Sequence, residues 1–191
     1  MVYVFTKRIF DIVFSFSVLV LASIPLAVTM LLIRMETKGN AIYWSERVGI
    51  DGSTYMMPKF RTMVVGTPEL PTGELSNPGQ YITGIGRRLR KSSLDELPQF
   101  YSVLVGHMSV VGPRPMIPQE QEIFRERVST GVAALRPGIT GWAQINGRDA
   151  LSVEEKVALD VQYLQRRSFW FDLKIVFLTV GYVFKGKDIS H

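Results

Sequence analysis

The chain opens with an apolar run that differs from everything after it. Residues 12–33 contain 22 positions without a charged side chain. At about 1.5 Å per residue, a straight helix of this length would cross a hydrocarbon core of roughly 30 Å. Pro25 lies near the middle, where it cannot donate to the carbonyl of Leu21 and disfavours helical geometry at Ile24. The pattern predicts a membrane helix that is broken around Ser23 and Pro25.

Two topologies fit this segment: a kinked helix that spans the membrane and a re-entrant hairpin that returns to the same side. Cations flank both ends, with Lys7 and Arg8 before the run and Arg34 and Lys38 after it. An excess of Lys and Arg marks the cytoplasmic side of a membrane helix, so basic flanks at both ends favour the hairpin. Proline is also common in spanning helices, and the pattern alone leaves the two topologies nearly even.

The residues after the apolar segment have the mixed polar and apolar pattern that is typical of a small soluble domain. Residues 41–44 and 55–57 predict short strands around a turn at 49–52. Helices are expected at 85–90, 97–104, 118–128, 153–165 and 169–184, with loops at 64–82 and 133–147 and an extended, Pro-rich segment at 112–118. The fold class is therefore predicted as α+β, mainly helical, with a membrane segment at 1–38 and a second domain at 39–191.

The last helix and the overall charge both bear on the environment. Residues 169–184 are rich in aromatic side chains, which suit a membrane interface, although a buried core helix fits nearly as well. The net charge of +5 is compatible with nucleic acid, an anionic membrane face or a phosphorylated substrate. The membrane segment argues against nucleic acid. Without Cys and with two isolated His residues, a thiolate or His-based metal site is excluded.

The densest chemical signal is the adjacent pair Asp95 and Glu96, which follows the basic run 87–91. A capping box with Ser93 as its cap is the simpler interpretation, but Pro98 would then fall beyond the first turn. A helix that begins nearer Asp95 places both carboxylates at its N-terminus, where an anion is favoured and Asp95 stays ionised. Such a carboxylate can act as a nucleophile or bind a divalent cation.

Several cations occupy settings that restrict the backbone. Lys59 and Arg61 end a predicted strand, and Arg114 lies between two prolines, which suits bidentate phosphate binding. Arg136 and Arg148 lie in Gly-rich segments that could approach a nucleotide closely. Together with the carboxylate pair and the membrane segment, these residues point to phosphate chemistry at a membrane surface.

These stretches resemble the monotopic phosphoglycosyl transferases, bacterial sugar transferases built from a membrane helix and one catalytic domain. The matching segments run in order along almost the whole chain: Lys7–Asp11, Glu46–Gly49, Lys59–Met63, Ser93–Gln99, Gly106–Pro115 and Arg136–Arg148. The resemblance implies that residues 39–191 form the catalytic domain. It also implies a re-entrant membrane helix, with both its ends and the catalytic domain on the cytoplasmic face of the bacterial inner membrane.

The resemblance further implies a reaction. A sugar-1-phosphate would pass from a UDP-sugar to a polyprenol phosphate such as undecaprenyl phosphate, with release of UMP. Asp95 would be the nucleophile that forms a covalent phospho-sugar intermediate, and Glu96 with Asp95 would hold Mg²⁺. Arg90 and Arg114 would bind phosphates, Lys59 and Arg61 are weaker candidates, and Arg148 would lie near the nucleotide.

Two features depart from the family pattern. Ile24 separates Ser23 from Pro25, whereas in the family Ser and Pro are usually adjacent, and the loop at 64–82 has no close match. The sequence does not identify the sugar, the glycan pathway or the oligomeric state, a homo-oligomer included. A non-catalytic module that binds nucleotide-sugars at the membrane is the main alternative, and the intact Asp95–Glu96 pair argues against it.

Overall fold

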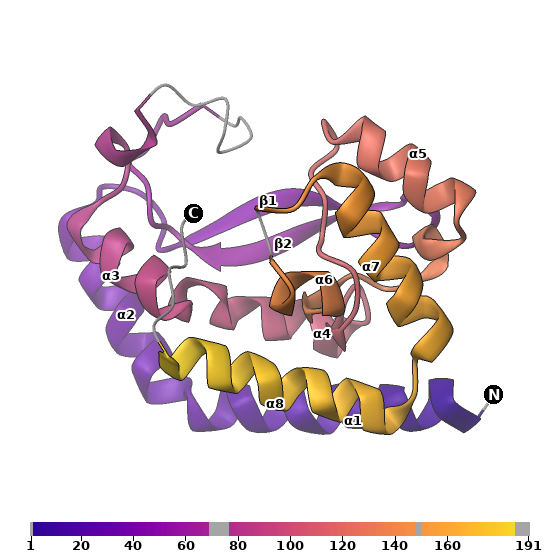
Figure 1. Ribbon diagram of the computed structural model, residues 1–191. Helices are drawn as coiled ribbons and strands as arrows, with labels where there is room; N and C mark the ends of the chain where they lie inside the picture. The colour runs from indigo at the N-terminus through magenta and orange to yellow at the C-terminus, as the bar shows by residue number, and fades with distance from the viewer. Residues whose placement is uncertain (1, 69–76, 148–149, 186–191) are drawn as a thin grey trace.

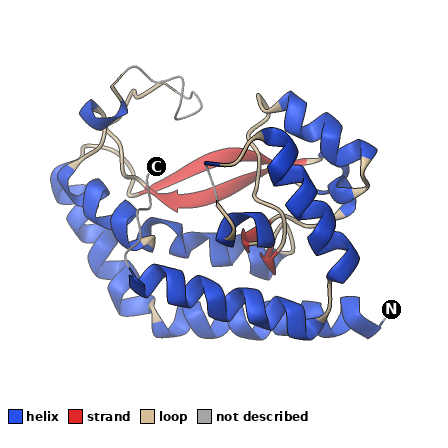
Figure 2. Cartoon of the chain, viewed as in Figure 1, coloured by secondary structure: helices blue, strands red, loops and turns tan. Residues whose placement is uncertain are grey.

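Helices make up most of the chain in the computed structural model, which describes residues 2–68, 77–147 and 150–185 (Figures 1 and 2). The α-helices are α1 (Val2–Leu21), α2 (Ser23–Glu36), α3 (Gly84–Ser92), α4 (Phe100–Val105), α5 (Gln121–Ser129), α6 (Trp142–Ile145), α7 (Val153–Arg166) and α8 (Phe169–Lys185). Short 3-10 segments are η1 (Ile50–Gly52), η3 (Pro78–Gln80), η4 (Leu94–Gln99) and η5 (Val132–Ala134). The strands are β1 (Ile42–Val48), β2 (Thr54–Phe60), β3 (Ser109–Val111) and β4 (Gly138–Thr140). The predicted α+β, mainly helical class is confirmed.

The N-terminal apolar segment forms two helices, α1 and α2, which meet at Ala22 with a bend of 60°. Ser23 and Ile24 occupy the first two positions of α2, so Pro25 falls in the first helical turn. Amides there have no acceptor within their own helix, so the missing N–H of proline costs least at this point. This geometry accounts for a proline inside α2, and the predicted break is confirmed.

No single helix among the described residues is long and apolar enough to cross a membrane. The bent pair of α1 and α2 meets that requirement by length and composition, as a broken span or a re-entrant loop.

The charged residues of α1 bond to the rest of the protein. Lys7 forms an ion pair with Asp172 of α8, with 2.9 Å between Nζ and Oδ2. Arg8 donates to the carbonyls of Val103 and Leu104 at the end of α4. The two cations that suggested a membrane topology therefore serve at least partly to dock α1 onto the domain.

Asp11, 2% exposed, continues this docking face one turn further along α1. It accepts hydrogen bonds from the Ser109 hydroxyl at 3.1 Å and from the Val110 amide at 3.0 Å. The carboxylate thereby joins α1 to strand β3. Helices α1 and α8 run side by side along one edge of the molecule (Figure 1).

The opposite face of this helix pair is apolar and exposed. Its large side chains include Val4, Phe5, Ile9, Val13, Phe16, Val20, Trp170, Phe177 and Tyr182. Helix α8 also buries Phe171 and Ile175 in the core. One face of the last helix therefore lies in the core and the other carries exposed aromatic side chains, and its place at a membrane interface stays a prediction.

The predicted hairpin is confirmed and is longer than the sequence indicated. Strands β1 and β2 pair antiparallel with Tyr43 opposite Lys59 and Arg47 opposite Tyr55. Because side chains alternate between the two faces of a strand, Arg47 lies on the same face as Lys59. This face of the hairpin forms one wall of the candidate site.

One region that was expected to be irregular contains regular structure. Residues 133–147 were expected to be a loop, but they contain β4, which pairs parallel with β3, and the short helix α6. Gly112 and Gly138 allow the two backbones to approach closely, since a side chain on Gly112 would collide with the carbonyl of Arg136. Strands of three residues are too short to leave a period-two pattern.

The helix expected at 97–104 begins earlier than predicted. The chain first forms the 3-10 segment η4 and then continues into α4.

Two apolar clusters hold the elements together. The larger one contains Tyr55, Met57, Val103, Met108, Val110, Val111, Ile145, Tyr163, Phe171 and Ile175. The smaller one joins α2, β2 and α3 through Ile33, Ala41, Phe60 and Leu89. The second cluster matters for the site, because α3 leads directly into the carboxylate pair. Residues 69–76, within the loop predicted at 64–82, lie outside the described residues.

Candidate active site

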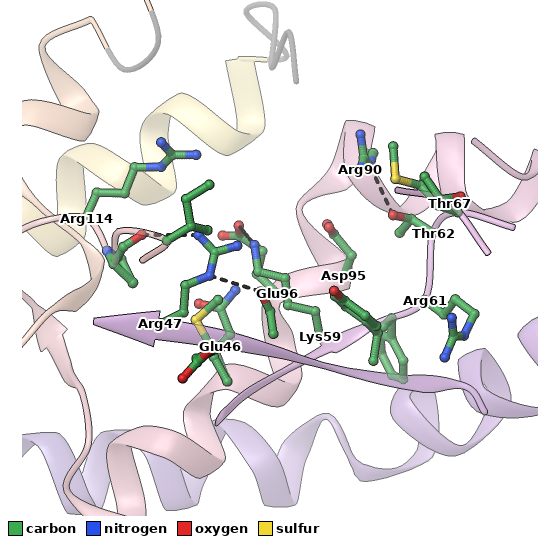
Figure 3. A pocket seen from close by; sticks show the side chains of 18 of the residues that line it. Glu46, Arg47, Lys59, Arg61, Thr62, Thr67, Arg90, Asp95, Glu96 and Arg114 are labelled. Atoms are coloured by element: carbon green, nitrogen blue, oxygen red, sulfur yellow. Dashed lines mark hydrogen bonds and ion pairs between the residues drawn. The ribbon is translucent and has the colours of Figure 1, made fainter. Parts of the chain in front are cut away.

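A cavity of about 540 Å³ opens between the β1–β2 hairpin, the segment after β2, η4 and the loop after β3. Six of the predicted site residues line it: Lys59, Arg61, Arg90, Asp95, Glu96 and Arg114. They come from β2, α3, η4 and a loop, so residues as far apart in sequence as 59 and 114 are brought to one place (Figure 3).

The local chain path places the two carboxylates. Ser93 caps the C-terminus of helix α3; it takes a left-handed conformation with φ of 54° and donates its amide to the Arg90 carbonyl. The chain then turns at once into η4, whose first turn contains Asp95 and Glu96. Asp95 is only 6% exposed, and both side chains line the cavity.

Burial and the neighbouring Glu96 raise the pKa of Asp95 to about 6, while Lys59 and Arg90 act in the opposite direction. The shift runs in the direction opposite to the one expected from a helix N-terminus, because loss of hydration is its largest cause. The Oδ1 atom of Asp95 is buried without a hydrogen-bond partner. A buried carboxylate oxygen without a partner is uncommon in a folded protein, which makes Asp95 a candidate for binding a ligand or taking part in a reaction.

Lys59 supplies a cation beside this pair. Its Nζ lies 3.4 Å from Oε1 of Glu96. Burial lowers the pKa of Lys59, and the negative charge of Glu96 opposes that shift. The ammonium group therefore compensates part of the charge that two adjacent carboxylates bring into the cavity.

Further cations lie on both sides of the carboxylate pair (Figure 3). On one side, Arg90 donates from Nε to the Thr62 hydroxyl at 3.0 Å, and its buried Nη1 has no hydrogen-bond partner. On the other side lie Arg47 and Arg114. Burial and the proximity of Arg114 lower the pKa of Arg47. Two guanidinium groups that share one cavity wall repel each other, and an anion bound between them would relieve that repulsion.

The loop that carries Arg114 is fixed from outside the cavity. Arg127 forms an ion pair with Asp160, with 2.7 Å between Nη2 and Oδ2. Its Nη1 also donates to the Arg114 carbonyl at 2.8 Å. The Val48 amide donates to the Met116 carbonyl and so ties β1 to the same loop. Helices α5 and α7 and strand β1 thereby hold the backbone at Arg114.

The other predicted cations differ in position. Arg61 lines the cavity, but its Nε donates to the Asn40 carbonyl and its guanidinium stacks over Tyr43. Arg136 does not line the cavity; its Nε donates to the Gly106 carbonyl at 2.9 Å, so we remove it from the candidate site. Arg148 lies outside the described residues, and its predicted role stays a prediction.

Two polar residues of the cavity, Arg47 and Thr62, lie in segments matched to the family but were not predicted as site residues. Arg47 could have been found from the sequence. The period-two pattern of β1 places it on the same face of the hairpin as Tyr43, which pairs with Lys59 of β2. Thr62 lies just beyond β2, and no local pattern predicts its bond to Arg90, 28 residues later.

The donor set suits a hard divalent cation. Mg²⁺ binds one or two carboxylates and completes its octahedron with water and substrate phosphates. Asp95 offers an unpartnered buried oxygen, and Glu96 is its immediate neighbour. Among the described residues there is no group of three or more His, Cys, Asp or Glu side chains that could form a complete protein cage. An ion here would need oxygens from the substrate.

Comparisons with known proteins identify the family of this chain. The family model described as bacterial sugar transferase matches residues 2–186. The UDP-glucose:undecaprenyl-phosphate glucose-1-phosphate transferase of Escherichia coli (strain K12) is 41% identical over 94% of this chain, which spans 40% of that protein. The sugar transferase EpsL of Bacillus subtilis (strain 168) is 39% identical over 96% of this chain and 90% of its own length. The undecaprenyl-phosphate galactose phosphotransferase of Salmonella typhimurium is 37% identical over 95% of this chain and 41% of its own length. The chain belongs to the bacterial sugar transferase family.

Proposed function

We propose that this protein transfers a sugar-1-phosphate from a UDP-sugar to undecaprenyl phosphate or a similar polyprenol phosphate, and releases UMP. The observation that carries the proposal is the buried, unpartnered carboxylate oxygen of Asp95 in a cavity lined by cations. The names of the similar proteins from Escherichia coli and Salmonella supply the class of donor and acceptor. Because one acts on glucose and the other on galactose, the sugar itself stays open.

The reaction proceeds in two displacements at phosphorus. A carboxylate oxygen of Asp95 attacks the sugar-bearing phosphorus of the UDP-sugar, and the bond to the bridging oxygen breaks, so UMP leaves with that electron pair. A phosphate oxygen of the polyprenol phosphate then attacks the same phosphorus. The bond to Asp95 breaks, the carboxylate is restored, and the product is a polyprenol diphospho-sugar. Neither step requires a general acid, because the leaving groups are a phosphate and a carboxylate.

The cavity residues supply charge for these steps. Arg90 with Thr62 on one side, and Arg47 with Arg114 on the other, bind phosphate oxygens and neutralise the charge that anionic attack on an anion creates. Lys59 holds Glu96 and compensates the carboxylate pair. With a pKa of about 6, Asp95 is mostly ionised at pH 7 and is a more basic nucleophile than an ordinary carboxylate.

Mg²⁺ is the proposed cofactor, held by Asp95 and Glu96 together with phosphate oxygens of the substrate. When bound, it would supply positive charge to the diphosphate. The protein's own part is to present one unpartnered oxygen and a second carboxylate on the same short helix.

For the membrane, we propose a re-entrant hairpin formed by α1 and α2, with α8 at the interface and the catalytic domain on the cytoplasmic face of the bacterial inner membrane. The exposed apolar side chains of these helices support it, because lipid tails would cover a surface that water does not favour. In this chain without Cys, single Cys substitutions at residues 4 and 38 should label from the same side of the membrane. Labelling from opposite sides would disprove the hairpin.

The reaction itself is tested with the full chain in lipid nanodiscs and a panel of UDP-sugars. We expect one or a few of them to release UMP without the acceptor in an amount close to one equivalent per protein. Mass spectrometry should then find the phospho-sugar on Asp95. Binding of UDP-sugars without UMP release, or an adduct on another residue, would contradict the proposal.

A further inference from the structure

Glu36, the last residue of α2, is unfavourably placed for its own helix. A carboxylate at a helix C-terminus meets the negative end of the helix dipole. Its oxygens instead lie at the N-terminus of α3, where Oε1 accepts from the Gly84 amide at 2.8 Å and Oε2 from the Ile85 amide at 3.0 Å. Gly84 and Ile85 are 48 and 49 residues from Glu36 in the sequence. The carboxylate therefore stabilises α3 and not the helix to which it belongs.

The hydrogen bonds of the first turn of α3 depend on this residue. The Thr83 hydroxyl accepts from the Gly86 amide at 2.9 Å, and the Arg87 amide donates to the Thr83 carbonyl. The remaining first-turn amides, at Gly84 and Ile85, are those that Glu36 accepts. A Cβ atom at Gly84 would lie 2.9 Å from Oε1 of Glu36, so a side chain there would force the carboxylate to shift.

Helix α3 connects this contact to the candidate active site. Its nine residues include Arg90, and the chain turns at Ser93 directly into Asp95 and Glu96. On its inner side, Gly86 packs so closely on the Thr62 carbonyl that a side chain there would collide with it. A displacement of α3 would therefore move a phosphate-binding cation and the carboxylate pair together.

Apolar packing links the same elements. Ile33 of α2 and Leu89 of α3 belong to one buried cluster with Ala41 and Phe60. Leu89 immediately precedes Arg90, so the cluster lies directly behind the cavity wall. The polar contact of Glu36 fixes the near end of α3, and this cluster fixes its far end.

We propose that Glu36 is a positioning residue that couples the bent helix pair to the active site by fixing α3, and thereby Arg90 and Asp95, in the geometry the reaction needs. The activity part of this inference rests on the proposed function. The structural part does not, because it concerns hydrogen bonds within the protein.

The structural part is tested by hydrogen exchange on the full chain in lipid nanodiscs. Glu36→Ala should raise the exchange rate at Gly84 and Ile85 at least about tenfold, since both amides lose their acceptor. It should also raise exchange at Ser93 and Glu96, whose amides donate to the Arg90 and Ser93 carbonyls at the other end of α3. Glu122→Ala, an exposed carboxylate in the first turn of α5, is the control and should change none of these rates.

The activity part uses the same variants. Because small misplacements of reacting groups cost large factors in rate, Glu36→Ala should lower kcat roughly tenfold with KM changed less than about threefold. Glu36→Gln keeps one carbonyl acceptor and should recover part of the rate. In an Arg90→Lys background, Glu36→Ala should lower kcat less than about threefold, because the group it positions is already altered.

Unchanged exchange at Ser93 and Glu96 in Glu36→Ala would overturn the proposal, since the residue would then only cap its helix locally. A loss of kcat that matches the loss of folded protein, or that is undiminished in the Arg90→Lys background, would overturn it as well. A wild-type protein that releases no UMP from any UDP-sugar would refute the proposed function alone, because the exchange measurement needs no substrate.

Discussion

Two buried aspartates show how differently this protein uses the same side chain. Asp172 of α8 is 2% exposed and accepts from Lys7 at 2.9 Å, Tyr3 at 3.0 Å and Tyr163 at 2.7 Å. Asp95 of η4 is 6% exposed, yet its Oδ1 has no partner and a second carboxylate is adjacent. One carboxylate is fully satisfied and the other is not, although both are removed from water.

The difference separates a structural charge from one that we propose to be reactive. A buried charge is tolerated when donors surround it, and Asp172 thereby joins α1, α7 and α8 into one unit. An incompletely satisfied buried charge carries a free-energy cost that is retained where it serves a ligand or a reaction. Replacing each aspartate by asparagine should therefore have opposite effects on stability and activity.

The largest effect is expected for Asp95→Asn. Without a carboxylate nucleophile, the rate of UMP release should fall at least about 1,000-fold. The raised pKa means that ionised Asp95 destabilises the folded state above the ordinary carboxyl pKa of 3.8, with the full cost present above about pH 6. A neutral amide removes that cost, so the free energy of unfolding at pH 7 should rise by on the order of 1–3 kcal/mol.

Chemical denaturation and single-turnover UMP release measure the two effects of Asp95→Asn separately. The gain in stability should disappear below about pH 4, where the carboxyl group is protonated in the folded and the unfolded chain. A variant that is less stable than the wild type at pH 7 would remove the contrast with Asp172.

Asp172→Asn should produce the reverse pattern. The amide cannot accept all three donors and leaves the Lys7 ammonium without its ion pair, so the free energy of unfolding should fall by about 3 kcal/mol. UMP release per folded molecule should stay within about threefold of wild type, because Asp172 does not line the cavity. Glu122→Gln on exposed α5 is the matched control and should change neither value. A large loss of kcat in fully folded Asp172→Asn would show that the two regions are not separable.

The sequence predicted the residues around Asp95 but not the contacts of Asp172. The carboxylate pair at 95–96 and its cations were identified from adjacent charges, prolines and a family resemblance, all of which are local patterns. Asp172 was not singled out, because its partners Lys7 and Tyr3 lie 165 and 169 residues away. Long-range polar contacts leave no periodic signal in a chain.

The elements of the fold also differ in how well the sequence predicted them. The helix break, the hairpin and the amphipathic helices follow from periodicity and turn residues, and all are present. The parallel pair of β3 and β4 was missed because each strand has three residues and depends on a tertiary contact at Gly112 and Gly138. Tertiary packing, rather than local preference, decides such segments.

The cations sharpen the comparison further. Lys7 is paired with Asp172, whereas Arg47 shares its cavity wall with another guanidinium, that of Arg114. Arg47→Ala should therefore lower kcat/KM for the UDP-sugar roughly 10- to 100-fold, the equivalent of about 1.4–2.7 kcal/mol, with little loss of stability. Arg125→Ala on the exposed side of α5 is the control. An equal loss in both variants would mean that overall charge, not this cavity, attracts the substrate.

The smallest effect concerns the titration of Asp95. Burial is the first cause of its raised pKa and Glu96 the second, so Glu96→Gln should move the pKa downward from about 6 but not restore the ordinary value. The carboxyl carbon-13 shift of Asp95, followed by NMR without divalent ions, reports this midpoint directly. A downward shift of this midpoint would show that the charge of Glu96 contributes, because burial alone would leave the midpoint of Glu96→Gln where the wild type has it.

Lys59→Met is the complementary test and should move the midpoint upward, since it removes a cation that favours the ionised form. A midpoint that responds to neither substitution would mean that burial alone distinguishes Asp95, and the contrast with the fully partnered Asp172 would then rest on hydrogen bonds and not on neighbouring charge.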